Sequence, residues 1–285
     1  MSANTQNLCI VCGGTSHRQL YEGLLRCRAC GYVFADARLT DEELRALYDE
    51  DFFTGAEFSD YAEDELHLRK NFRARLRVLR RFLDPSRHKR LLEIGSAYGF
   101  FLEEARALFE SVEGIDITGA GIAHARERFQ LDVTLGDFLS HDYGARRFDV
   151  VCMWDTIEHL REPQRFVEKI ASLTERGALL ALTTGDIESL NARLRGRRWR
   201  LIHPPTHLHY FSRRTIARLL AAHGFDVVYN RPCGFYRSLD NVAYNVFVLR
   251  HNLRLPHALL RRAGVARLGF YLNLSDIMYV IARRR

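Results

Sequence analysis

The chain has 285 residues, 47% of them hydrophobic, and a formal net charge of +7. This length accommodates one large domain with an appendage, and the apolar content is sufficient for a core. No run approaches eighteen uncharged apolar residues, which argues against a transmembrane helix, and residues 1–8 lack the pattern of a signal peptide. We therefore expect a cytoplasmic protein whose six cysteines stay reduced.

The charge is unevenly distributed along the chain. Residues 189–285 contain eighteen arginines, no lysine and three aspartates, which gives +15, so residues 1–188 carry −8. Such a basic segment is either a solvated arginine-rich surface or a face for an anionic partner, such as a phosphorylated acceptor, a lipid headgroup or RNA. Charge alone leaves these alternatives open.

Two C-x-x-C-G segments near the N-terminus predict a metal site. Their thiols are those of Cys9, Cys12, Cys27 and Cys30. Four sulfurs form a closed tetrahedral site, which suits structural zinc and leaves no open position for catalysis. Disulfides are the alternative, and a reducing setting disfavours them. The remaining cysteines, Cys152 and Cys233, are expected in the fourth strand of a sheet and in a later loop, as buried small side chains.

The segment between these cysteines and residue 88 is predicted to be helical. Thr40 and Glu43 have the spacing of a capping box that opens a short helix. Aromatic residues follow over 48–61, and they either join the core or form a lid over a bound cofactor. Apolar residues near helical spacing then predict a helix over 61–83 that leads into the first strand of a sheet.

Residues 89–102 read KRLLEIGSAYGFFL, and a second strand ends in Gly-Ile-Asp-Ile at 114–117. Gly95 and Gly99 let the backbone approach a ligand where a Cβ atom would collide. Asp116 stands where the second strand of a nucleotide-binding fold presents a carboxylate to two ribose hydroxyls. Phe100 replaces the third glycine of G-x-G-x-x-G. S-adenosylmethionine (SAM), which has no diphosphate, therefore fits this turn better than NAD.

Strands and helices continue to alternate after this turn. A third strand precedes Gly136-Asp137-Phe138, a fourth starting at Phe148 ends in W-D-T-I-E-H-L at 154–160, and a fifth covers 178–184. With E-I-G-S-A-Y-G and G-I-D, residues 88–184 closely resemble a class I SAM-dependent methyltransferase. The resemblance implies an α/β fold with a Rossmann-like seven-stranded sheet whose last strand is antiparallel. Ala97 departs from the commoner central glycine of the turn.

The resemblance also implies which residues bind SAM. These are Glu93, Gly95, Ser96, Gly99, Asp116, Ile117, Asp137, Phe138, Trp154 and Asp155. The glycine turn would line the methionine and ribose part, and Asp116 would bind the ribose hydroxyls. Ile117 would pack on the adenine, Asp137 would accept from its amino group, and residues 154–155 would border the methionine end.

Methyl transfer needs an aligned acceptor and a base, because the sulfonium is already an activated leaving group. Alignment lowers the barrier by roughly 7–11 kcal/mol, and a positioned base contributes about 10²–10⁴-fold in rate. His159 is the first candidate base, because it leaves the fourth strand where acceptors bind in related enzymes. His207 and Tyr210 form a second candidate group in a loop expected to overhang the site. Each of these residues could instead pack, cap a helix or brace the loop.

The exit of the fourth strand also excludes some chemistry. Amine methyltransferases of nucleic acids commonly have an Asn/Asp-Pro-Pro-aromatic turn there, whereas this chain has Trp-Asp-Thr-Ile at 154–157. No acid cluster suggests a catalytic magnesium site. We therefore expect an oxygen or nitrogen acceptor and no catalytic metal, with carbon as an alternative.

The last part of the chain is predicted to complete the sheet. Residues 224–229 read as a sixth strand and 276–282 as a seventh, inserted antiparallel. Between them, leucines alternate irregularly with arginines over 239–274. This basic insertion is expected to be a wall of the acceptor pocket, a dimer contact or a segment on a membrane surface.

The N-terminal cysteine segment resembles the zinc-knuckle head of many bacterial small-molecule methyltransferases, which act on sugars, glycans and natural products. We thus expect a knuckle over 1–40, a helical lid or linker over 41–87, and a methyltransferase domain over 88–285. The expected function is methyl transfer to a small or carrier-linked acceptor, and the basic segment would suit an anionic one. A zinc-finger-bearing rRNA methyltransferase and a non-catalytic SAM-binding scaffold are the alternatives. The sequence does not indicate an oligomeric state.

Overall fold

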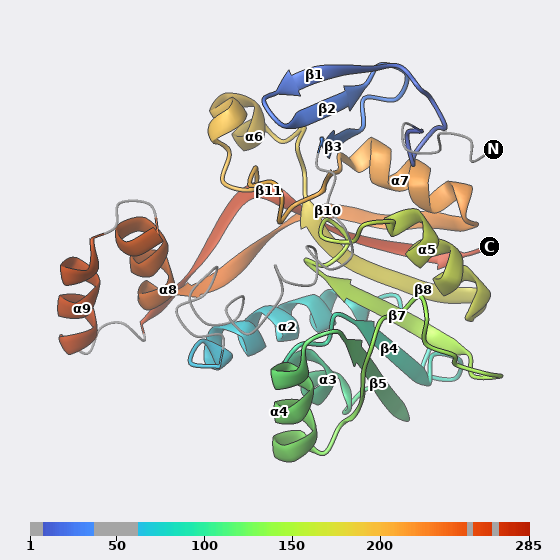
Figure 1. Ribbon diagram of the computed structural model, residues 1–285. Coiled ribbons are helices and arrows are strands. Elements are labelled where there is room, and N and C mark those ends of the chain that lie inside the picture. The colour runs from blue at the N-terminus through green and yellow to red at the C-terminus, as the bar shows by residue number, and fades with distance from the viewer. Residues whose placement is uncertain (1–7, 37–61, 250–252, 264–267) are drawn as a thin grey trace.

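The computed structural model describes residues 8–36, 62–249, 253–263 and 268–285. Figure 1 shows a central sheet with helices on its faces, a small N-terminal sheet at one end, and an arm that carries two helices away from the body. The capping box at Thr40 and the aromatic run over 48–61 lie outside the described residues. Within the described part, no helix has the length and apolar character needed to cross a bilayer.

The central sheet has seven strands in the order β10-β11-β8-β7-β4-β5-β6. Their bounds are β4 Arg90–Ile94, β5 Ser111–Asp116, β6 Asp132–Leu135, β7 Phe148–Trp154, β8 Thr174–Gly185, β10 Phe225–Ser238 and β11 Gly269–Arg284. The strands from β4 to β8 pair in parallel, whereas β11 is antiparallel to both β8 and β10. The predicted Rossmann-like sheet with an antiparallel last strand is confirmed.

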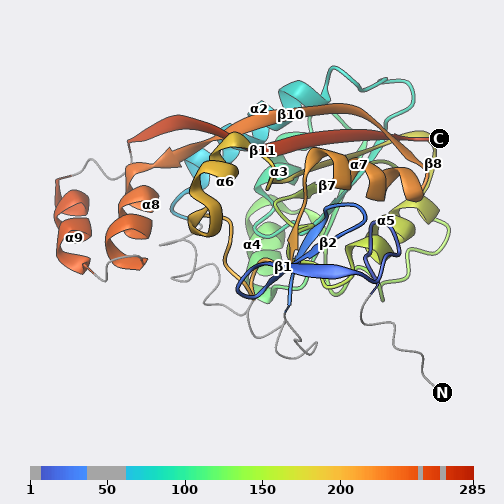
Figure 2. The ribbon, with the colours of Figure 1, turned by 90° about the horizontal axis from the view of Figure 1, so that it is seen from above.

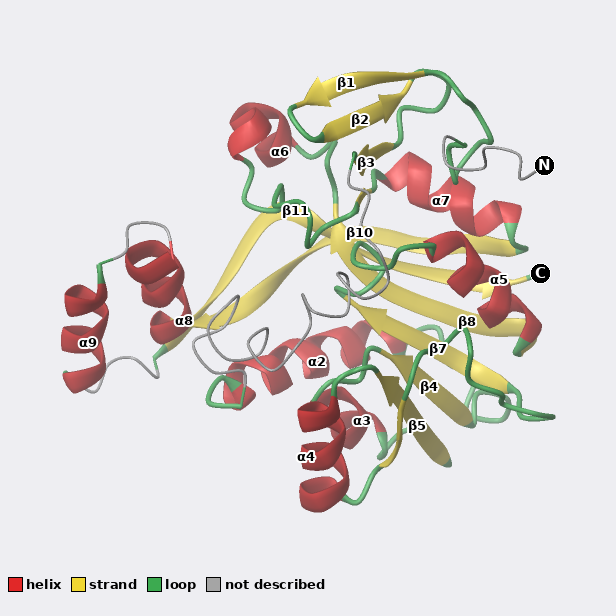
Figure 3. Cartoon of the chain, viewed as in Figure 1, coloured by secondary structure: helices red, strands yellow, loops and turns green. Residues whose placement is uncertain are grey.

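Helices cover both faces of this sheet (Figure 3). Their bounds are α2 Glu65–Leu79, α3 Phe100–Ala105, α4 Gly119–Phe129, α5 Pro163–Ser172, α6 Leu190–Arg195, α7 Arg213–Ala222, α8 Leu239–Ala243 and α9 Arg254–Arg262. Alternate side chains of a strand point to opposite faces. In β7, Val150 and Cys152 accordingly pack in the cluster that includes α2, α3 and α4, whereas Val151 and Met153 pack with α5 and α7.

Local sequence signals fix several helix ends. Pro163 occupies the first turn of α5, where a missing N–H costs nothing. Ser212 and Thr215 form a reciprocal capping box at the start of α7. The helix predicted over 61–83 is shorter, since α2 ends at Leu79 and the chain then turns.

The C-terminal strands are longer than the sequence suggested. β10 was expected over 224–229 and β11 over 276–282, but they continue beyond β8 as a two-stranded ribbon that pairs residues 235–238 with 269–272. Pro232 and Gly234 concealed the strand pattern, and an edge strand tolerates both. Cys233 therefore lies in β10, and its expected place in a loop was wrong. The insertion itself forms α8, a π-helix over Tyr244–Leu249 and α9 at the end of the ribbon (Figure 2).

The N-terminal module is a small sheet that a later segment of the chain completes. Its strands are β1 His17–Tyr21, β2 Leu24–Cys27, β3 Val33–Ala35 and β9 His209–Tyr210, in that order. β3 pairs antiparallel with β9, which lies between β8 and α7 in the sequence. The module is thus joined through main-chain hydrogen bonds to the loop that carries the candidate catalytic histidines.

Candidate functional site

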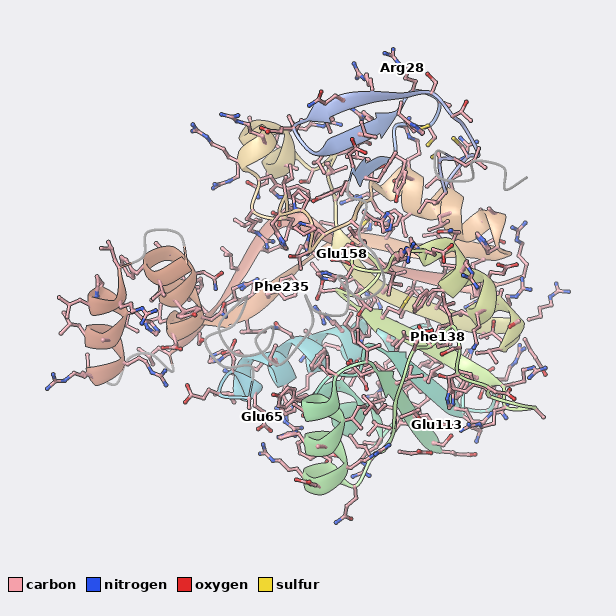
Figure 4. All side chains as sticks on the ribbon, viewed as in Figure 1. Arg28, Glu65, Glu113, Phe138, Glu158 and Phe235 are labelled. Atoms are coloured by element: carbon pink, nitrogen blue, oxygen red, sulfur yellow. The ribbon has the colours of Figure 1, made fainter. Side chains whose placement is uncertain are left out.

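A cavity of about 610 Å³ lies where the parallel strands end. Its walls come from the loops after β4, β5, β6 and β7, from one side of α2, and from residues 200–201, 207 and 235–237. Figure 4 labels Glu158 and Phe235, which reach this cavity from the β7 exit and from β10. The carboxyl edge of a parallel sheet is where open α/β folds bind ligands.

The glycine turn after β4 forms one wall of the cavity. Gly95 has φ +79°, and a Cβ atom there would lie 2.7 Å from Oγ1 of Thr156. Gly99 has φ +76° but is not among the residues that line the cavity. A Cβ at Gly99 would instead approach Leu131 and Ala125 at 2.7 and 2.8 Å. Gly99 therefore allows α3 to pack against α4. Glycine is required at this position for that packing, and not for the contact with the ligand that the sequence analysis expected.

Asp116 fixes the turn and faces the cavity. Its Oδ2 accepts a hydrogen bond from the N–H of Ala97 at 2.8 Å, and its Oδ1 accepts from the N–H and the hydroxyl of Thr118 at 2.8 and 2.5 Å. Ala97 has φ +43°, a region in which glycine is commoner, and the bond to Asp116 holds it there. A carboxylate oxygen can accept two bonds, so Oδ2 retains capacity for a ligand hydroxyl.

Three buried polar atoms around the cavity have no hydrogen-bond partner within the described residues. They are Oε2 of Glu93, Oγ of Ser96 and Nε1 of Trp154. Burial, and then the charge of Asp116, raises the pKa of Glu93 well above its usual range. Orphaned groups of this kind are uncommon in folded proteins, and a polar ligand in the cavity would satisfy them.

The remaining predicted contacts lie along the same cavity. Ile117 is half exposed and Phe138 is buried, and both line its wall. Asp137 lines the same wall and accepts from the N–H groups of Leu139 and Ser140 at 3.2 and 3.1 Å. The structure thus brings together all the predicted SAM-binding residues except Gly99.

Arg75 of α2 is a site residue that the sequence prediction missed. Its guanidinium donates to Oδ2 of Asp155 at 2.7 Å and lies 5.1 Å from the ring centre of Trp154. The ion pair holds Asp155 at φ +51° on the cavity wall. One signal was available in the sequence: Arg75 shares the buried side of the helix with Phe72 and Leu76.

His159 and His207 come together on one wall, as the sequence suggested. Their ring centres are 4.5 Å apart, although the residues belong to different loops. Nδ1 of His159 donates to the carbonyl of Thr206 at 3.0 Å, and Nδ1 of His207 donates to that of Leu201 at 2.9 Å. Each ring is thereby held in the tautomer whose Nε2 bears the lone pair. Burial lowers the pKa of His159 to about 4 and also lowers that of His207, so both are neutral at pH 7.

Tyr210 lies elsewhere. It is buried in β9, packs with Leu24 and Trp199, and is not part of the cavity wall. Its hydroxyl donates to the carbonyl of His207 at 3.0 Å. Burial raises the pKa of Tyr210 well above its usual range, which disfavours the phenolate that a base would require. Tyr210 positions the His207 backbone and is not placed to touch an acceptor.

The four predicted cysteine ligands lie together. All four sulfurs are within 4.8 Å of one another, with Cys9–Cys30 at 3.5 Å and Cys12–Cys27 at 3.6 Å. These separations are too long for disulfides, whereas Zn–S bonds of about 2.3 Å place the sulfurs of a tetrahedron about 3.8 Å apart. Gly13 and Gly31, at φ +71° and +82°, follow the second cysteine of each pair and make the turns. The residues fit a structural zinc ion.

Ligand atoms of Glu158, His159 and His207 also lie within 4.8 Å of one another. Imidazole and carboxylate together suit a transition metal better than magnesium. The sequence did not suggest this group, because His207 is distant from the other two residues along the chain. The expectation that the protein has no catalytic magnesium site remains a prediction.

Residues 66–230 match the family model described as a methyltransferase domain. Among curated proteins, the ubiquinone biosynthesis O-methyltransferase of Nitrobacter winogradskyi is 28% identical over 99 residues. The match covers 33% of this chain and 38% of that protein.

Two solved structures show the same fold. The magnesium protoporphyrin IX methyltransferase of Synechocystis PCC 6803 has a TM-score of 0.53 at 15% identity, covering 86% of this chain and all of the other. A SAM-dependent methyltransferase from Thermotoga maritima has a TM-score of 0.50 at 16% identity, covering 79% of this chain and 94% of the other. Since the family model matches more than half of the sequence, the chain belongs to the methyltransferase domain family.

Proposed function

We propose that this protein transfers a methyl group from SAM to an oxygen atom of a small or carrier-linked acceptor, such as a sugar, a glycan intermediate or a secondary metabolite. One observation carries the proposal. A single cavity has Asp116 and the orphaned polar atoms of Glu93, Ser96 and Trp154 on one side, and a neutral histidine pair on another wall.

The cavity has the chemistry that SAM requires. SAM carries positive charges on its sulfonium and ammonium groups, and the wall of the cavity that would hold it includes the acidic side chains of Asp116 and Asp155. The Asp116 carboxylate would accept from the ribose hydroxyls, and the orphaned atoms of Glu93, Ser96 and Trp154 would offer donors and acceptors to the methionine end. When bound, SAM supplies a methyl group on a sulfonium that leaves as a neutral thioether.

His159 would take the acceptor proton. Nε2 of His159 would accept the O–H proton of the acceptor during methyl transfer, and the imidazolium would then return that proton to solvent. The bond from Nδ1 to the carbonyl of Thr206 orients the ring for this transfer. A pKa of about 4 means that the His159 imidazole is neutral at pH 7, with the lone pair on Nε2 that a proton acceptor needs.

Arginines on the wall of the cavity favour an anionic acceptor. Arg200 and Arg237 are two of them. Arg200 pairs with the buried Asp276 at 3.1 Å and remains about one-third exposed, so a phosphate could share its guanidinium. The oxygen chemistry is supported by the O-methyltransferase of N. winogradskyi, although the match covers only 38% of that protein.

The test uses SAM with a tritiated methyl group and extracts separated into small-molecule, lipid, protein and RNA fractions. Methyl transfer should label the small-molecule fraction or a lipid-linked carrier, with no label for Asp116→Ala. Label confined to RNA would favour the rRNA alternative. SAM binding without label in any fraction would favour the non-catalytic scaffold, and failure to bind SAM would refute the proposal itself.

A further inference from the structure

The arm beyond the central sheet ends in a helix whose apolar side faces outward. α9 has no buried residue, and Leu255 and Leu259 are 70% and 56% exposed. Residues four apart share a helix face, so these two leucines form one surface. Leu253, just before the helix, is 51% exposed. We define Leu253, Leu255 and Leu259, with the flanking Arg254 and Arg262, as the arm-tip surface.

The polar side of α9 faces the rest of the arm. Nε2 of His257 is 2.9 Å from Oδ1 of Asp240 in α8, and the His257 ring packs on Tyr244. Arg261, one turn later, is 2.6 Å from Glu63 and 3.7 Å from Asp240. A surface helix of a globular protein normally turns its apolar side to the core. In α9 the ion pairs of His257 and Arg261 hold the helix so that Leu255 and Leu259 stay exposed, while Leu260 is half-buried.

The exposed leucines of α9 do not line the cavity. The cavity wall includes residues 235–237 at the base of the arm and none of the described residues from 239 to 274. Figures 1 and 2 both place α8 and α9 at the far end of the ribbon, away from the central sheet. The expectation that the insertion forms a wall of the acceptor pocket is thus not supported beyond Arg237.

The positive charge around the exposed leucines of α9 indicates what kind of partner the arm-tip surface binds. Arg254, Arg261 and Arg262 carry the charge of the helix, within residues 189–285, whose net charge is +15. Two copies joined through this surface would bring their arginines together, whereas an anionic partner would neutralise them. RNA would contact the arginines but leave the leucines in water. Exposed leucines bordered by arginines match the interface of a bilayer with anionic lipids, in which leucines enter the acyl boundary and guanidinium groups stay among the headgroups.

We propose that the arm-tip surface docks the protein on an anionic lipid membrane as a peripheral contact. The proposal does not depend on which acceptor the enzyme uses. Insertion of three leucines and attraction of two flanking arginines would give reversible binding that weakens with salt, because a single short helix is a weak anchor.

The test is flotation of the full chain with phosphatidylcholine vesicles, and with vesicles that also contain phosphatidylglycerol. We expect binding to the anionic vesicles, little binding to the neutral ones, and loss at high salt. Arg254→Gln with Arg262→Gln should weaken binding by about 30-fold, since each cation near such a surface contributes about fivefold. Leu255→Ser with Leu259→Ser should weaken it by at least about tenfold.

A matched control is Leu8→Ser with Val228→Ser, which removes two exposed aliphatic side chains, 50% and 40% exposed, outside the arm. This variant should bind like the wild type. Equal binding of the arm variants and the wild type would overturn the proposal, as would no binding to anionic vesicles. A stable dimer in sedimentation that Leu255→Ser with Leu259→Ser dissolves, without vesicle binding, would assign the surface to a second copy. Salt-sensitive retention of RNA with no vesicle binding would assign it to nucleic acid.

Discussion

The phenol of Tyr32, two residues after Cys30, donates a hydrogen bond to Nδ1 of His209. Nε2 of the same imidazole donates to the carbonyl of Leu160 at 2.7 Å, next to the candidate base His159. The carbonyl of Glu158 accepts from the N–H groups of Leu208 and His209 at 2.9 and 3.1 Å. The cysteine module is therefore joined to the β7 exit by a short chain of buried hydrogen bonds.

Removing the Tyr32 hydroxyl tests this connection. Tyr32→Phe leaves Nδ1 of His209 buried without its donor, so the free energy of unfolding should fall by about 1–3 kcal/mol. Denaturant unfolding measures the change. Tyr143→Phe is the matched control, because the Tyr143 hydroxyl is buried and has no hydrogen-bond partner in the described structure, so its removal should be neutral or stabilising. Equal losses for both variants would contradict the role given to Tyr32.

Metal content tests the cysteine site. The purified chain should contain one zinc ion, and Cys27→Ser should lose it together with more than about 4 kcal/mol of stability, the scale expected for loss of a structural metal. Elemental analysis and thermal unfolding measure both. A chain that is as stable without zinc as with it would contradict the structural role. Two ions per chain, reduced to one by His207→Ala, would place a second ion at Glu158, His159 and His207.

Stability should fall on mild acidification. Burial, opposed by the bonds to Leu160 and Arg161, lowers the pKa of His209 to about 4, and that of His159 is also about 4. As the pH falls below about 6.5, the unfolded chain binds protons at these positions before the folded chain does. Their contribution is thus complete above pH 6.5 and is lost toward pH 4, by roughly 3 kcal/mol for each group. Urea midpoints that do not change between pH 7 and 4.5 would contradict these pKa values.

His159→Ala tests the base. It should lower the rate of methyl transfer by about 10²–10⁴-fold and leave SAM affinity unchanged, because the imidazole acts on the acceptor proton. Tyr210→Phe, which alters a residue outside the cavity, should keep the rate within a few-fold of the wild type. Initial rates of label transfer measure both variants. A fully active His159→Ala would move the role to His207.

The parts of the site predicted from sequence are those that depend on neighbours along the chain. The spacing of Gly95 and Asp116 across one strand–turn–helix–strand unit is local, and the structure places both at the cavity. The sequence singled out Gly99 but assigned it to ligand binding. Glycine is needed there because of the close approach of Leu131 and Ala125, which depends on how α4 packs.

The features that the sequence analysis missed depend on contacts between residues far apart in the chain. Arg75 reaches Asp155 across 80 residues. The ribbon of β10 and β11 depends on pairing between segments more than thirty residues apart, and the predicted strands over 224–229 and 276–282 therefore ended too early and began too late. The sequence does not predict that the leucines of α9 face outward. It shows an amphipathic pattern, but the orientation of the helix is set by ion pairs with Asp240 and Glu63, which lie far away in the sequence.

The most direct test is calorimetric titration of SAM into the wild type, Asp116→Ala and Asp116→Asn. The wild type should bind one SAM per chain, and both variants should bind at least about 100-fold more weakly, since two charge-assisted hydrogen bonds to the ribose are lost. Asp116→Asn is included because its amide can still accept from Ala97 and hold the turn, and a thermal scan should show both variants folded. Folded variants that bind SAM as tightly as the wild type would contradict the assignment of this cavity to the cofactor.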